Sequence, residues 1–75
     1  MDKKMLLRLV EQARKRVESS DETINDQHRI IAALEGKGLN SDEARAILAR
    51  LITAQDTELA EMERLLDIMD REMEC

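Results

Sequence analysis

The chain has 75 residues, of which 43% are hydrophobic and 39% are charged, and its formal net charge is −5. A chain of this length forms one small domain with little room for a core, and this balance of residues excludes both a disordered polyelectrolyte and a membrane span. The chain contains no proline and no aromatic residue, so good helix formers dominate and no ring can stack on a nucleobase or a flavin. The composition therefore predicts an all-α protein.

The only strong break in the helical pattern is the segment 35–42, which contains both glycines of the chain. Gly36 or Gly38 can end a first helix in the left-handed conformation, and Asn40 or Ser41 can cap a second one. These signals predict helices over about residues 3–35 and 41–73, joined by a loop over about 36–40. A loop this short forces the helices to lie side by side, so we expect a single antiparallel helical hairpin over residues 1–75.

The first predicted helix carries a sustained heptad repeat, which is typical of a coiled coil. Its expected seam residues are Leu6, Val10, Ala13, Val17, Ser20, Ile24, Gln27, Ile31 and Leu34. The second helix, with one four-residue stutter after Gln55, is expected to contribute Ala44, Leu48, Leu51, Gln55, Leu59, Met62, Leu66, Met69 and Met73. Folding the chain about the loop pairs residues whose numbers sum to about 75, so that Val10, for example, faces Leu65 or Leu66.

Polar residues interrupt this seam at Ser20, Gln27 and Gln55, and the pairing places Ser20 and Gln55 in one layer. We interpret the polar residues as a layer that costs some stability and fixes the register and the oligomeric state. Charge supports the same register, because residues 1–17 carry a net charge of +4 and residues 56–75 a net charge of −6. Arg14, for example, is expected beside Glu61.

A second set of aliphatic side chains remains after the seam has been used, namely Leu7, Leu9, Ile30, Ile47, Ile52, Leu65 and Ile68. Each large apolar side chain left in water forfeits roughly 1.5–3 kcal/mol relative to burial. A patch of this size usually marks an interface. The sequence therefore predicts self-association, most simply as a homodimeric four-helix bundle, with a different protein as the alternative partner.

Residues that could carry chemistry do not form a recognisable group. His28 is the only histidine, and Cys75 is the only cysteine. The sequence has no Glu-x-x-His pair, no phosphate-binding loop and no carboxylates isolated among apolar residues. It therefore predicts no catalytic residue, no metal and no cofactor. We therefore expect a non-enzymatic protein. Because the sequence has no signal peptide and no disulfide pair, we also expect it to be cytoplasmic and not to act at a membrane.

A cluster of basic residues offers an alternative function; it comprises Lys3, Lys4, Arg8, Lys15 and Arg16. A basic stripe on a helix can bind the phosphates of a nucleic-acid duplex, as some small dimeric helical hairpins do. The net charge of −5 and the acidic end of the second helix argue against this function. The preferred interpretation is that these residues form salt bridges, and a nucleic-acid-binding regulator is the alternative.

The segment from Gln27 to Leu66 resembles a group of short bacterial helical-hairpin proteins of uncharacterised function. The similar residues are mostly seam and cap positions, namely residues 28–35 (HRIIAALE), Gly38, Asn40, Ser41, residues 44–48 (ARAIL) and Gln55. The resemblance implies a coiled-coil hairpin and brings no known activity.

Overall fold

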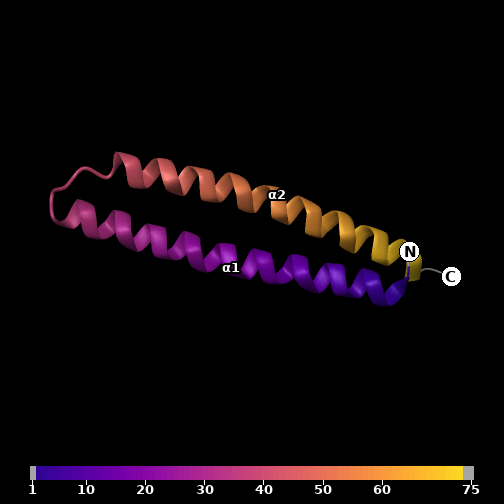
Figure 1. Ribbon diagram of the computed structural model, residues 1–75. Coiled ribbons are helices and arrows are strands. Elements are labelled where there is room, and N and C mark those ends of the chain that lie inside the picture. Colours follow the sequence, from indigo (N-terminus) through magenta and orange to yellow (C-terminus); the bar gives the residue numbers. More distant parts are fainter. Residues whose placement is uncertain (1, 74–75) are drawn as a thin grey trace.

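The protein consists of two long helices joined by one short loop in the computed structural model, which describes residues 2–73. Helix α1 spans Lys3–Gly36 and helix α2 spans Asp42–Met73. The helices lie side by side and run in opposite directions, forming a rod with Cα extents of 60 × 14 × 14 Å (Figure 1). The predicted all-α two-helix hairpin is confirmed. Its open end is formed by the start of α1 and the end of α2, and its loop end by residues 37–41.

Side chains and one glycine end the helices at the expected break. At the open end, Asp2 caps α1 by accepting a 3.2 Å hydrogen bond from the backbone N–H of Lys4. At the loop end, Gly38 adopts a φ of 72°, which a residue with a side chain rarely does. The N–H groups of Gly38 and Leu39 then donate to the carbonyls of Glu35 and Leu34, at 3.0 and 2.9 Å. This pattern is the Schellman motif, so Gly38 is the residue that terminates α1.

Helix α2 begins with two residues that share the capping role. The Asn40 side-chain oxygen accepts a 2.8 Å hydrogen bond from the N–H of Asp42, and the Ser41 carbonyl accepts the first helical bond, from Arg45, at 2.9 Å. Asp42 and Glu43 place negative charge on the first turn, where the helix dipole favours it. The Ser41 hydroxyl points instead towards α1, where it donates to the Glu35 carboxylate at 2.9 Å.

The seam on α1 follows the heptad repeat. The side chains of α1 that are buried or half-buried are Leu6, Leu9, Val10, Ala13, Val17, Ser20, Ile24, Gln27, Ile31 and Leu34. This set contains every residue expected in the seam and adds only Leu9. A repeat of 3.5 residues keeps one stripe of the helix against its neighbour over its full length, which explains why so few other side chains are shielded.

The seam on α2 differs from the expected one after Gln55. Glu58 and Leu65 are half-buried, whereas Leu66 is 37% exposed. The shielded positions contain a continuous heptad through Glu58, Met62 and Leu65. Leu59 and Met69 are half-buried as expected, but the expected place of Leu66 in the seam is wrong. Because α1 follows a heptad, α2 must present the same period to it, even at the cost of a half-buried carboxylate. The side chain of Met73 and the whole of Cys75 lie outside the described residues.

The core of the hairpin is thin. Among the residues whose burial is described, the buried hydrophobic ones are Leu6, Ala13, Ile31 and Ala44, and Leu6 is the one large side chain exposed by less than 2%. The chain of 8.6 kDa has an accessible surface of 5792 Å². A compact monomer of that mass would expose about 4,700 Å² by the usual scaling of surface with mass. The hairpin therefore leaves roughly 1,100 Å² more in water than a compact fold would.

Truncating Leu6 should destabilise the hairpin more than truncating its neighbour Met5. Leu6 is 1% exposed and Met5 is 54% exposed. We expect Leu6→Ala to lower the free energy of unfolding by about 2–5 kcal/mol, because it leaves a cavity, and Met5→Ala to change it by no more than about 0.5 kcal/mol. Urea denaturation followed by circular dichroism at one fixed protein concentration measures both, and equal losses would contradict the seam assigned to α1.

Candidate self-association surface

Ser20 and Gln55 meet in the middle of the hairpin. The Gln55 side-chain amide donates to the Ser20 hydroxyl at 3.1 Å and also to the Asp21 carboxylate. The Ser20 hydroxyl in turn donates to the Val17 carbonyl at 2.9 Å. Ser20 and Gln55 are therefore in contact across the seam, as the sum rule of about 75 predicts, and Asp21 is a third member that the rule did not include.

Gln27 occupies a separate position nearer the loop. Its side chain is 9% exposed, and its amide donates a 2.9 Å hydrogen bond to the Ala44 carbonyl. Because a buried amide without a partner is costly, this bond is what makes a glutamine tolerable in the seam. The bond also ties α1 to the first turn of α2, which helps to set the relative position of the two helices.

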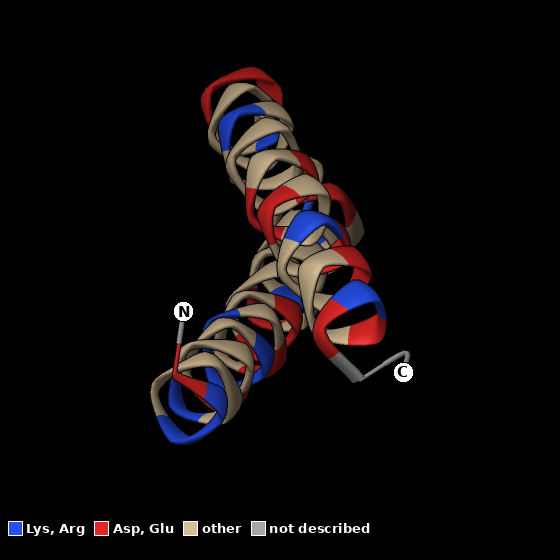
Figure 2. Ribbon diagram, turned by 90° about the vertical axis from the view of Figure 1, so that its right-hand side faces the viewer, with Lys and Arg blue, Asp and Glu red and all other residues tan. Residues whose placement is uncertain are grey.

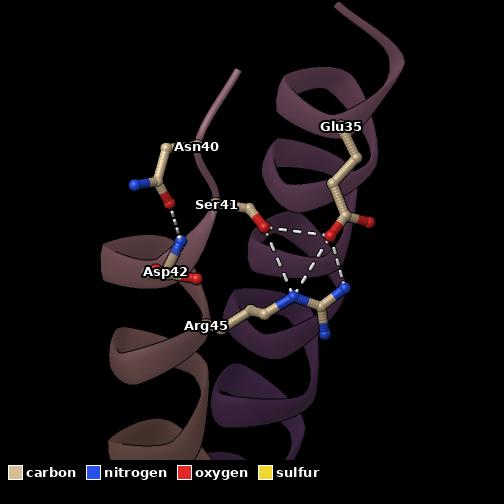
Figure 3. A network of polar contacts seen from close by, with 5 residues as sticks. All are labelled: Glu35, Asn40, Ser41, Asp42 and Arg45. Atoms are coloured by element: carbon tan, nitrogen blue, oxygen red, sulfur yellow. Dashed lines mark hydrogen bonds and ion pairs between the residues drawn. The ribbon is translucent and has the colours of Figure 1, made fainter. Parts of the chain in front are cut away.

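A network of polar side chains joins the helices at the loop end (Figure 3). The Glu35 carboxylate accepts hydrogen bonds from the Ser41 hydroxyl and from two nitrogens of the Arg45 guanidinium, one of them Nε at 3.1 Å. The Arg45 Nε also lies 3.3 Å from the Ser41 hydroxyl oxygen. The hydrogen bonds from Arg45, and then that from Ser41, lower the pKa of Glu35 below its ordinary value. These contacts reinforce the loop geometry and do not form a catalytic arrangement.

The seam divides the surface of the hairpin into two long sides. The groove side contains a shallow groove of about 440 Å³ between the helices, lined by Arg16, Ser19, Ser20, Thr23, Leu51, Ala54 and Glu58. The opposite side, which we call the ion-pair side, carries the Glu35–Arg45 ion pair and the Asp21–Gln55 hydrogen bond. On each helix, the residues that flank the seam on one side recur every seven positions. On the groove side these series contain Arg16 on α1 and Ala54 on α2, and on the ion-pair side they contain Asp21 on α1 and Arg45 on α2.

The aliphatic residues expected to mediate self-association do not form one continuous patch. The heptad places Leu9, Ile30, Ile47 and Ile68 on the groove side, with Leu7 and Ile52 on the ion-pair side. Leu65 is a seam residue and is half-buried within the hairpin. Ile30 is 50% exposed and Ile47 is 39% exposed, whereas Leu9 and Ile68 are half-buried. The heptad pattern of the sequence could have assigned these aliphatic residues to two sides if the predicted α2 seam had continued through Glu58.

Most ion pairs of the described residues form within one helix and not across the seam, where they were expected. Arg14 forms ion pairs with Glu11 and Glu18 of its own helix rather than with Glu61. Within residues 2–73, the ion pair that joins the two helices is Glu35–Arg45. Basic positions dominate the start of α1, and the end of α2 beside it is mostly acidic (Figure 2). Phosphates approaching the basic cluster would therefore meet the field of the α2 carboxylates.

Residues that could bind a metal or react are not gathered into a site. The described part of the chain contains no group of three or more histidine, cysteine, aspartate or glutamate side chains placed to hold a metal ion. His28 is exposed on α1. Neither described helix is long and apolar enough to cross a membrane.

Comparison of the chain with models of protein families, with curated proteins and with solved structures finds no match. The surface itself is therefore the basis for a functional proposal.

Acid should weaken the loop-end network. Because the pKa of Glu35 is lowered in the folded state, its contribution to stability is complete above its unfolded pKa, near 4.5, and is lost as the pH falls through the folded pKa. We expect an NMR titration of the Glu35 side-chain carboxyl to give a midpoint below 4.5 and Arg45→Gln to move it back towards 4.5. An unchanged midpoint in the variant would show that Arg45 does not hold the carboxylate.

Replacing Gln55 of the polar layer by an apolar residue should raise the stability of the hairpin and make the register of its helices less specific. We expect Gln55→Leu to raise the free energy of unfolding by about 1 kcal/mol, because an apolar residue then fills the seam while Ser20 keeps its bond to Val17. The same variant should lose a single well-defined register, visible as extra or broadened NMR resonances. Thr53→Leu, on an exposed position of α2, is the control and should leave the spectrum homogeneous.

Proposed function

We propose that this protein acts by protein–protein association and that its functional form is a homodimer, a four-helix bundle made of two hairpins. The chemistry-bearing residues of the described chain are dispersed, which supports a role in binding rather than in catalysis. The observation that carries the proposal is the excess of exposed aliphatic surface on a hairpin whose fully buried apolar core, within the described residues, consists of one leucine, one isoleucine and two alanines.

The size of one side of the hairpin matches what a stable dimer needs. A side spans 60 × 14 Å between Cα atoms, or about 840 Å². Specific protein–protein interfaces bury about 800 Å² per partner. A contact over one whole side would therefore be of standard size, and of the same order as the roughly 1,100 Å² by which the hairpin exceeds a compact monomer. A second copy of the same chain offers such a side without requiring any other protein.

Dimerisation should be visible as a mass and as a concentration dependence. We expect sedimentation equilibrium at micromolar concentrations to give twice the chain's 8.6 kDa. The melting temperature should rise with protein concentration, because a dimer is stabilised by mass action. A folded monomer of 8.6 kDa whose melting temperature is independent of concentration would contradict the proposal.

Binding to nucleic acid through the basic end of α1 stays an alternative prediction. A gel shift with duplex RNA or DNA that weakens with salt and disappears on replacing Lys3, Lys4 and Arg8 by alanine would favour it over self-association as the function.

A further inference from the structure

The two sides of the hairpin differ in how well each could pack against a copy of itself. On each side, one residue of α1 and one of α2 flank the seam at the same level, and we call such a pair a rung. On the groove side the rungs are Leu9–Ile68, Arg16–Glu61, Thr23–Ala54 and Ile30–Ile47. The rungs follow from the seam, in which Ile31 faces Ala44. Ile30 directly precedes Ile31, and Ile47 lies about one turn after Ala44, so Ile30 and Ile47 flank this seam pair.

Symmetry sets a strict condition on such a side. When two hairpins pack face to face about a two-fold axis that runs along the rod, both loops lie at the same end. Each rung then meets its own copy with the two helices exchanged, so the α1 residue faces the partner's α2 residue. A rung is compatible with its copy only if it pairs two apolar residues, two small residues, or one basic with one acidic residue.

All the groove-side rungs meet this condition. Ile30–Ile47 and Leu9–Ile68 are apolar and lie towards opposite ends of the rod. Thr23–Ala54 is small, and its side chains line the shallow groove, so two hairpins can approach most closely there. Arg16–Glu61 is basic and acidic, so each Arg16 would face a Glu61 of the second copy, and the reverse. One position further outward, Asp26, which pairs with Arg29 of its own helix, and Arg50 also occupy one level.

The ion-pair side fails the same condition. By the same pairing rule its rungs are Leu7–Leu66, Arg14–Leu59, Asp21–Ile52 and His28–Arg45. Leu7–Leu66 is apolar, but a copy of this side would set the Arg14 guanidinium against Leu59 and the Asp21 carboxylate against Ile52. Those charges would lose water without gaining a partner, which is costly. Arg14 is paired with Glu11 and Glu18 of its own helix, and Asp21 accepts from Gln55, but a copy of this side would bring no opposite charge to either one.

The reverse orientation of the groove side is also less compatible. With the loops at opposite ends, each α1 packs against the other α1, and Arg16 meets Thr23 while Glu61 meets Ala54. The aliphatic rungs still meet one another, but both charges lose their opposite charge. Only the arrangement with both loops at one end satisfies every rung.

We propose that the groove side is the surface on which a second copy of this chain docks, with both loops at the same end and Arg16 of each copy opposite Glu61 of the other. This inference rests on the proposed homodimer and specifies its face and its symmetry axis.

Matched substitutions on the two sides test the face. Ile30 and Ile52 are the same residue type with similar exposure, 50% and 41%. Ile30→Asp should raise the dimer dissociation constant about a hundredfold, because the change occurs twice in a two-fold interface, and Ile52→Asp should raise it less than about threefold. Sedimentation equilibrium measures both constants, and circular dichroism verifies that each variant is helical at high concentration.

A mixing experiment tests the axis and does not depend on a disruptive substitution. Homodimers of Arg16→Glu, and of Glu61→Arg, would each set like charges opposite one another. A mixed dimer of the two variants restores both opposite-charge contacts. Native mass spectrometry at about 10 mM ionic strength, where charges are weakly screened, should show mixed dimers enriched about fivefold over the statistical proportion.

The mixing control uses Lys15→Glu with Asp67→Arg, which make the same changes in net charge at positions that point away from the seam. This pair should mix in the statistical proportion. Equal enrichment in both mixtures, or none with the Arg16 and Glu61 variants, would overturn the proposed axis. A wild-type dimer that is broken by Ile52→Asp but not by Ile30→Asp would overturn the face and leave the homodimer standing. A wild-type monomer would instead overturn the homodimer itself.

Discussion

Two helices lying side by side can shield only one stripe of each other, and this geometric limit governs the rest of the molecule. Helices of 34 and 32 residues provide a long seam but no third element to close over it. Apart from Ser41 beside the loop, the buried residues of the described chain therefore lie in the seam, and Leu6 is the one large side chain among them that is almost fully withdrawn from water. Aliphatic residues beside the seam, such as Ile30 and Ile47, remain half exposed on either side of it. Further stabilisation would have to come from outside the hairpin, which is the physical basis of the proposed association.

The sequence predicts the fold well because local and long-range signals agree. The break at Gly38 and the caps at Asn40 and Ser41 define two helices, and the α1 heptad identifies the stripe that is shielded. The prediction is wrong where the local signal is ambiguous. Leucines at 59, 65 and 66 allow two seams on α2, and hydrophobicity alone favours the one that avoids Glu58. The heptad of α1 resolves the ambiguity, since a partner with a period of 3.5 residues selects the matching stripe on α2.

The ion pairs outside the seam could not be predicted from the seam pattern alone. Arg14 was expected to reach across to Glu61, but carboxylates one turn away on its own helix are nearer and need no particular register. Glu35 and Arg45 pair across the loop because the Schellman turn brings their helices together at that level, and Ser41 fills the space between them. The self-association interface stays a prediction, and the structure shows only how its expected residues are grouped. Leu65 belongs to the seam, and the remaining residues divide between two sides that the sequence list did not distinguish.

The division between the sides suggests how one sequence can favour a single dimer. Aliphatic surface alone is non-directional, so Ile52 and Leu66 could draw a second copy onto the ion-pair side as readily as Ile30 and Ile47 draw it onto the groove side. Arg14 and Asp21 oppose the first outcome, because burying them would separate them from water without supplying a partner. Arg16 and Glu61 do not oppose the second, because the two-fold axis of the proposed dimer would supply the partner that each one needs. In that dimer selectivity would arise from where the charges lie relative to the symmetry axis, and the apolar residues would supply the driving force.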